Sequence, residues 1–93
     1  MSYSLVMQSE AIIDIQEAFE WYETQQPGLG FRLIDEVENT LEKICRTPYH
    51  YTSINQQYRR IKVNRFSYLV IYEIEGGKLI VNAVRHTRRK PKF

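Results

Sequence analysis

Basic side chains and one histidine in the second half of the chain are the residues best suited to chemistry on an anion. Arg60 and Lys62 lie two positions apart, and His86 is followed by Arg88 and Arg89. Guanidinium and ammonium groups bind phosphates and carboxylates. A histidine can exchange a proton near neutral pH, or simply form a hydrogen bond at the end of a strand. The set therefore indicates an anionic partner, with proton transfer as an additional role.

The charges of the chain are segregated along its length, although the net charge is only +2. Residues 1–57 sum to −6 and residues 58–93 to +8. The stretch 85–93 holds five of the thirteen basic residues and no acidic one. A segregated positive half is typical of proteins that bind an anion, and it is equally compatible with a solvated surface balanced by acidic helices.

Other kinds of site lack the residues that they need. No paired His or Cys spacing supports a metal site, and no glycine-rich loop is suited to phosphate. Ser67 and His86 have no acid to complete a catalytic triad. The single cysteine, Cys45, cannot form an internal disulfide, which fits a reducing compartment. With no signal peptide and no long apolar run, the sequence predicts a cytoplasmic protein without cofactor, metal or membrane contact.

Hydrophobic periodicity gives the elements that must position the basic residues. A short apolar stretch, Tyr3–Met7, predicts a strand. Two helices follow: Ser9 is expected to cap the first, Pro27 ends it, and Pro48 ends the second. The apolar stripes of the two helices are Ile12, Ile15, Phe19 and Tyr22, and Phe31, Ile34, Val37, Leu41 and Ile44.

The period changes to two after a loop at residues 49–57, which predicts three strands. Gly76-Gly77 suits a two-residue hairpin turn, and Asn64-Arg65 is expected to form another. The strands are Tyr58–Val63, Phe66–Ile74 and Lys78–His86. Residues 1–93 are therefore expected to form one α+β domain with the order β-α-α-β-β-β. Its four-stranded antiparallel sheet would carry a helical hairpin on one face.

Alternation along the strands separates two faces of this sheet. The expected register pairs Leu69 with both Arg60 and Val84. The face under the helices would hold Ile61, Val63, Phe66, Tyr68, Val70, Tyr72, Ile74, Leu79, Val81 and Ala83, with Arg85 at its edge. The other face would hold an apolar patch of Leu69, Ile71, Ile80 and Val84, with Arg60, Lys62 and His86 at one end. Such a patch indicates a binding surface, unless loop 49–57 folds over it.

Four segments in this order resemble the RelE/ParE superfamily of bacterial type II toxins, and most of all its ParE-type branch. They are Ala18–Glu23, Gly28–Phe31, Arg65–Ile74 and Ala83–Pro91. The resemblance covers nearly the whole chain and depends on the order and spacing of the segments. It implies a β-α-α-β-β-β toxin, encoded beside an antitoxin that wraps it with a helix and an extended segment.

The resemblance also implies a choice of target. RelE-type members cut messenger RNA in the ribosomal A site, whereas ParE-type members inhibit DNA gyrase and are not known for catalysis. The nucleases usually carry an arginine at the position of Leu69 and a C-terminal tyrosine where this chain has Phe93. These differences favour a gyrase inhibitor. The alternatives are a ribosome-dependent mRNA endonuclease and a diverged, inactive member that only binds its antitoxin.

Roles for the candidate residues follow from these hypotheses. Binding of the target, gyrase or the ribosome with its mRNA, is assigned to Arg60, Lys62, Arg85, His86, Arg88 and Arg89. Binding of the antitoxin in a hetero-oligomer is assigned to Leu69, Ile71, Ile80 and Val84. A gyrase inhibitor needs no catalytic residue. In a nuclease, Arg60, Lys62, His86 and Arg88 would hold the phosphate and move protons.

Overall fold

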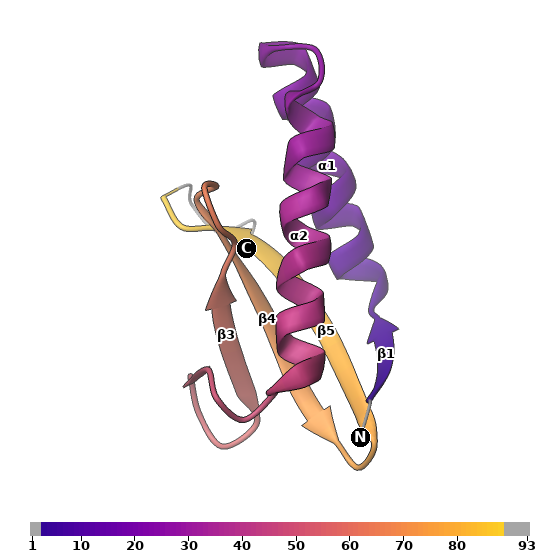
Figure 1. Cartoon of the computed structure of the whole chain (residues 1–93), viewed down its shortest axis with the longest axis vertical. Coiled ribbons are helices and arrows are strands. Elements are labelled where there is room, and N and C mark those ends of the chain that lie inside the picture. Colours follow the sequence, from indigo (N-terminus) through magenta and orange to yellow (C-terminus); the bar gives the residue numbers. More distant parts are fainter. Residues whose placement is uncertain (1–2, 89–93) are drawn as a thin grey trace.

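The computed structural model describes residues 3–88 (Figure 1). Its elements are β1 (Ser4–Met7), α1 (Ser9–Gln25), α2 (Leu29–Arg46), β2 (Thr52–Ser53), β3 (Tyr58–Lys62), β4 (Tyr68–Glu75) and β5 (Lys78–His86). The predicted order of long elements is confirmed, and β2 lies in the segment predicted as a loop. Arg89, which the sequence assigned to target binding, and Phe93, which stands where the nucleases carry a tyrosine, lie outside the described residues.

The sheet is mixed, whereas the sequence predicted four antiparallel strands. Its order is β1-β5-β4-β3-β2, and β1 pairs parallel with β5 while the other neighbours are antiparallel. Only Gln8 separates β1 from α1, so α1 continues in the direction of β1 (Figure 1). The helical hairpin then returns the chain to the start of β1, and β3 runs in the same direction as β1. Gln8 also takes the N-cap position expected for Ser9, and no side chain caps α1.

The turn between α1 and α2 is held by contacts of its glycines. Gly28 has a φ of 92°, in the left-handed region that glycine adopts readily. The Glu23 carboxylate accepts hydrogen bonds from the backbone amides of Gly28 at 3.3 Å and Gly30 at 2.7 Å. It therefore satisfies amides at the start of α2 that have no partner within the helix. Gly30 is also buried against Phe19 of α1.

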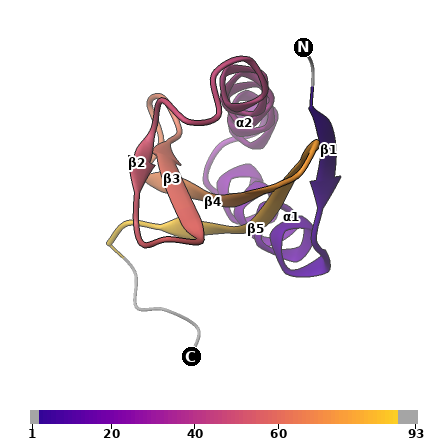
Figure 2. The same cartoon turned by 90° about the horizontal axis from the view of Figure 1, so that it is seen from below.

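The apolar core lies between the helices and one face of the sheet. Figure 2 shows α2 on the concave side of the curved sheet, and α1 packs along β5. The sheet contributes Tyr68, Val70, Tyr72, Leu79, Val81 and Val84, the link between β3 and β4 contributes Val63 and Phe66, and the helices contribute Ala11, Ala18, Leu33, Val37 and Ile44. The predicted helical stripes were partly wrong, since Ile12 is 52% exposed and Phe31 is 61% exposed. The small Ala11 and Ala18 allow α1 to approach the sheet, so they take the buried positions instead.

A buried carboxylate accepts a hydrogen bond from the backbone of β5 at the edge of the strand that faces β1. The strand β1 ends at Met7, so it cannot pair with the later residues of β5. Asp14 lies on the same side of α1 as Ala11 and Ala18 and is 7% exposed. Its Oδ2 accepts a hydrogen bond from the backbone amide of Val84 at 3.0 Å. A buried amide without a partner is costly. Beyond the end of β1, α1 therefore supplies the hydrogen-bond acceptor for the edge of β5 through Asp14.

Candidate functional site

The hairpin of β3 and β4 places Arg60 and Lys62 on the face of the sheet away from the core. Lys62 pairs with Leu69 and Arg60 pairs with Ile71. The turn spans residues 64–67 instead of two, which shifts the predicted register by two positions. Side chains alternate with a period of two, so this shift leaves their facing unchanged. The structure therefore brings these four residues together as predicted. We call this the open face, which is formed by Tyr58, Arg60, Lys62, Leu69, Ile71, Glu73, Ile80, Ala83 and Arg85.

A β-bulge in β5 overturns the predicted facing of its last residues. The register shifts opposite Ile71 and Tyr72, and Asn82 is an extra residue without a partner in β4. One extra residue sends every later side chain to the other face. Ala83 and Arg85 consequently lie on the open face, opposite Ile71 and Leu69, and not on the helix side as predicted.

Val84 and His86 lie on the helix side for the same reason, and their predicted place on the open face is wrong. Val84 is 4% exposed and belongs to the core. The His86 ring packs edge-on against Tyr68 at 5.0 Å between centroids. His86 Nδ1 also accepts a hydrogen bond from the backbone amide of Arg88 at 3.0 Å. Val84 thus faces the helices and not a partner on the open face, and the sheet separates His86 from Arg60.

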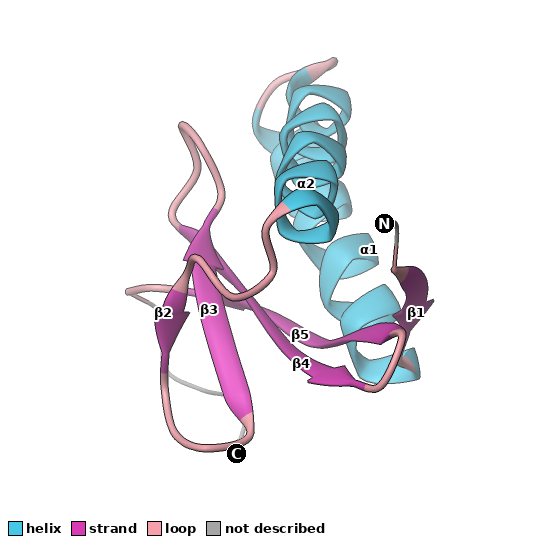
Figure 3. Cartoon of the chain, turned by 60° about the horizontal axis from the view of Figure 1, so that its bottom comes forward, coloured by secondary structure: helices cyan, strands magenta, loops and turns pink. Residues whose placement is uncertain are grey.

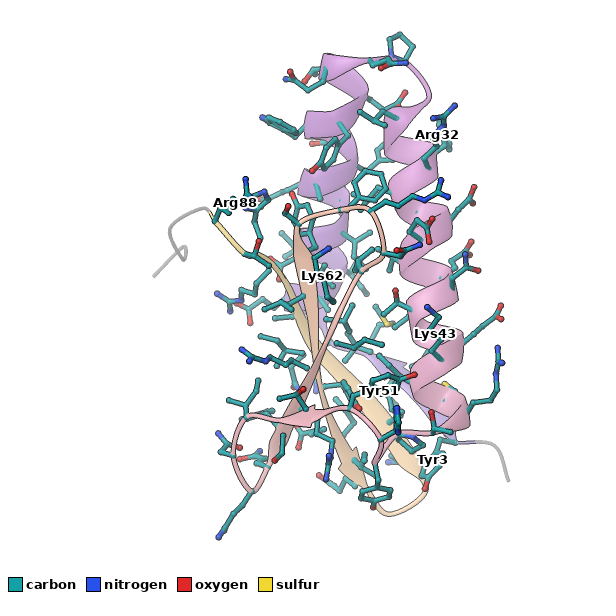
Figure 4. All side chains as sticks on the ribbon, turned by 60° about the vertical axis from the view of Figure 1, so that its left-hand side comes forward. Tyr3, Arg32, Lys43, Tyr51, Lys62 and Arg88 are labelled. Carbon is teal, nitrogen blue, oxygen red and sulfur yellow. The ribbon has the colours of Figure 1, made fainter. Side chains whose placement is uncertain are left out.

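Lys62 and Arg60 differ in their availability to a partner. Lys62 Nζ donates hydrogen bonds to the carbonyl oxygens of Val63 at 3.2 Å and Phe66 at 3.0 Å, which holds the turn after β3. The side chain of Arg60 is exposed and makes no hydrogen bond or ion pair with other residues in the range 3–88. In Figure 4, Lys62 and Arg88 lie toward one end of the sheet and Tyr51 toward the other. Arg60 is therefore the residue of β3 best placed to bind an anion.

Loop 47–57 is fastened to the sheet and extends it. Arg59 Nη1 donates hydrogen bonds to the carbonyl oxygens of Tyr49 at 3.2 Å and Tyr51 at 2.8 Å. The Tyr72 hydroxyl donates one to the carbonyl oxygen of Pro48 at 2.6 Å. Beyond these contacts β2 pairs with β3 as an edge strand (Figure 3). The alternative in which this loop folds over the apolar patch is therefore wrong.

The anchor at Tyr72 gives a testable pH dependence. Burial raises the pKa of Tyr72 from 10.0 to about 12, because the phenolate would lose its hydration. The folded state then holds this proton more tightly than the unfolded state. The resulting stability is complete below about pH 10 and is lost as the pH rises toward 12. We expect the melting temperature to fall more steeply over this interval in the wild type than in Tyr72→Phe. Equal slopes by circular dichroism would contradict the assignment.

Two hollows flank the apolar centre of the open face. The first has a volume of about 570 Å³ and is lined by His50, Tyr51, Thr52, Arg60, Ile61, Lys62 and Leu69. The second is a groove of about 480 Å³, lined by Gln8, Ser9, Glu10, Tyr58, Ile71, Asn82, Ala83 and Arg85. Arg85 Nη2 lies 3.2 Å from Glu10 Oε1 in this groove. The open face thus offers an apolar surface between a basic hollow and a groove that contains an ion pair.

No pattern in the sequence indicates that Glu10 is part of this site. Glu10 and Arg85 are 75 positions apart, and no local pattern connects them. Tyr58 could have been placed, because it shares the parity of Arg60 along β3. The buried position of Asp14 could also have been predicted, because it lies three positions after Ala11 and four before Ala18, on the same face of the helix.

Metal and thiol chemistry find little support among residues 3–88. Within that range no group of three or more His, Cys, Asp or Glu side chains could hold a metal ion. Cys45 is half-buried in α2, and burial raises its pKa, which disfavours the reactive thiolate. Neither α1 nor α2 combines the length and the apolar character that a helix needs to cross a membrane.

Comparison with known proteins gives a family and a fold. Residues 5–91 match the family model described as ParE toxin of type II toxin-antitoxin system, parDE. The structure resembles that of the chromosomal ParDE system from P. aeruginosa, with a TM-score of 0.82 and 11% identity. The match covers 94% of this chain and 98% of that one. No curated protein matches the sequence.

Two further solved structures share the fold. The E. coli toxin RelE, as a double arginine mutant in the free state, has a TM-score of 0.71 and 15% identity, and the match covers 95% of this chain and 86% of that one. The YoeB dimer from Staphylococcus aureus has a TM-score of 0.63 and 12% identity, with coverage of 92% and 98%. At these identities the structural matches support the fold alone.

Proposed function

Since the chain belongs to the ParE toxin family of type II toxin–antitoxin systems, within the RelE/ParE superfamily, we propose that it inhibits DNA gyrase by binding and is neutralised by a cognate antitoxin. It would act in the cytoplasm and would not catalyse a reaction of its own. One observation carries the choice of mechanism: the side chains that a nuclease of this fold would need are not gathered at one place.

Cleavage of RNA needs an acid or base within about 2.6–3.2 Å of the group whose proton it moves. It also needs cations at the same phosphate. Arg60 lies on the open face, whereas His86 lies on the helix side and packs against Tyr68. The ammonium group of Lys62 is already held by two carbonyl oxygens. A single ribose phosphate therefore cannot contact both Arg60 and His86.

The open face supplies a surface for binding in place of catalysis. Leu69, Ile71 and Ile80 are half-buried and adjacent in the register of β4 and its neighbours. We assign these three residues to the antitoxin, because partly covered apolar side chains on an open sheet are typical of a protein interface. Arg60 and the exposed Arg88 are assigned to gyrase or its DNA, together with Arg89 outside the described residues.

A supercoiling assay with purified gyrase and relaxed plasmid tests the proposal. The wild-type chain is expected to inhibit supercoiling, and His86→Ala is expected to inhibit it within about twofold of the wild type, because no proton transfer is involved. Arg60→Glu is expected to weaken inhibition about tenfold by placing a carboxylate at the basic contact. Lys43→Glu makes the same charge change on α2 and should leave inhibition unchanged. Normal supercoiling at excess wild-type chain would contradict the proposal.

Primer extension on translated messages after brief expression distinguishes the two alternatives. We expect growth arrest without new cleavage sites. New sites that disappear in His86→Ala would show an endonuclease instead. Expression that causes no growth arrest in cells without the antitoxin would identify an inactive member that only binds its partner.

A further inference from the structure

We propose that the groove beside Arg85 is where the toxin recognises its antitoxin through an exchange of carboxylates. An acidic side chain of an extended antitoxin segment replaces Glu10 as the partner of Arg85. An apolar side chain of the same segment packs on Ile71 and Ala83. This inference rests on the proposed function, because it specifies how the antitoxin of that proposal is bound.

The groove has the shape and lining that such a segment needs. It lies between the first turn of α1 and the open face, and its volume is about 480 Å³. Ala83 and the half-buried Ile71 opposite it in the sheet both line the groove and give it an apolar floor. Arg85 lies two residues further along the same strand. One segment can therefore contact the floor and the guanidinium together.

The existing ion pair is suited to exchange. Arg85 Nη2 and Glu10 Oε1 lie 3.2 Å apart, and 46% of the Glu10 side chain and 28% of the Arg85 side chain remain exposed. Exposed ion pairs of this kind contribute little to stability. Glu10 thus keeps Arg85 in place across the groove and opposes an incoming carboxylate only weakly. An antitoxin carboxylate that is shielded from water in the complex would bind Arg85 more strongly.

The charges favour an acidic peptide over a nucleic acid. Among the described residues lining the groove, Arg85 is the one basic side chain, and Glu10 is acidic. A nucleic-acid backbone needs several cations along its length, and its phosphates would be repelled by Glu10. An acidic peptide needs one cation and an apolar contact, which is what the groove provides. The charge of +8 on residues 58–93 further attracts an acidic partner.

Calorimetric titration with the protein encoded beside this gene tests the exchange. Arg85→Met keeps the apolar stem and is expected to weaken the complex at least about tenfold. Glu10→Gln removes the competing carboxylate and is expected to strengthen it about threefold. Glu42→Gln is the matched control, because Glu42 forms the exposed pair with Arg46 on α2 at 3.8 Å and the change in net charge is the same. It should leave affinity unchanged.

The combined variant excludes a general effect of charge. On the Arg85→Met background, Glu10→Gln should no longer change affinity, because the competition depends on Arg85. Misfolding cannot explain an increase in affinity, and the melting temperature of each variant checks the decrease. The inference is overturned if Glu10→Gln leaves affinity unchanged or weakens it, or if its effect persists on the Arg85→Met background. It is also overturned if Arg85→Met weakens binding to a DNA duplex and leaves antitoxin affinity intact. If the wild type does not bind the neighbouring protein at all, the proposed function fails as well.

Discussion

Asp14→Ala is expected to lower the free energy of unfolding by about 2–3 kcal/mol, because it leaves the amide of Val84 without an acceptor in the interior. For a domain of this size, that corresponds to a fall in melting temperature of roughly 10–20 °C. Thermal melting followed by circular dichroism measures the change. Hydrogen exchange at the Val84 amide should rise in parallel, since the bond that protects it is removed.

Asp14→Asn is the matched variant, because the amide side chain keeps an oxygen that can accept the same hydrogen bond. We expect it to lose about 1 kcal/mol, since the acceptor is neutral. A melting temperature for Asp14→Ala equal to that of Asp14→Asn would show that the hydrogen bond contributes nothing. The two variants also perturb the strand that carries the candidate site, because Val84 immediately precedes Arg85 in β5.

Gly30→Ala is expected to destabilise the helical hairpin by about 2 kcal/mol, or roughly 10 °C in melting temperature. A Cβ at this position would lie 2.7 Å from the carbonyl oxygen of Phe19 and 2.8 Å from Cγ of Glu23. The backbone oxygen cannot turn aside, so the helices must separate. The higher helix propensity of alanine recovers at most about 1 kcal/mol, which does not reverse the sign.

Gly77→Ala serves as the control for Gly30→Ala. A Cβ at Gly77 would meet no atom within 4 Å, and its φ is not positive. We expect a change within about 0.5 kcal/mol. If Gly30→Ala melts at or above the temperature of Gly77→Ala, the close approach of the two helices is not a source of stability.

Much of the architecture could be predicted from the sequence because periodicity reports local geometry. The alternation in β4 fixes which residues face the core, and Val70 and Tyr72 are fully buried as expected. The pair Glu75–Lys78 across the glycine turn is also confirmed, since a short hairpin sets its own register. The same parity placed Arg60 correctly, although the other turn proved longer than expected.

The remaining features depend on contacts between distant parts of the chain. After Asn82 the strand continues with the apolar pair Ala83 and Val84, which fits either face, so the sequence of β5 alone does not place the bulge. The position of the bulge depends on α1, where Asp14 accepts a hydrogen bond from the backbone amide of Val84. The direction of β1 could not be inferred either, because it depends on whether the link at Gln8 reverses the chain. The bulge moved His86 and Arg85 to faces opposite to those predicted, and the direction of β1 made the sheet mixed.

The parallel pairing of β1 with β5 has a consequence for the timing of folding during translation. The first strand of the nascent chain can find its neighbour only after β5 has been synthesised. The same holds for Asp14, whose partner Val84 is also in β5. Contacts between such distant segments form slowly, since the chain between them must first be brought together. The open face is therefore assembled late, and a partner that recognises the finished groove can bind the toxin only after β5 has been synthesised.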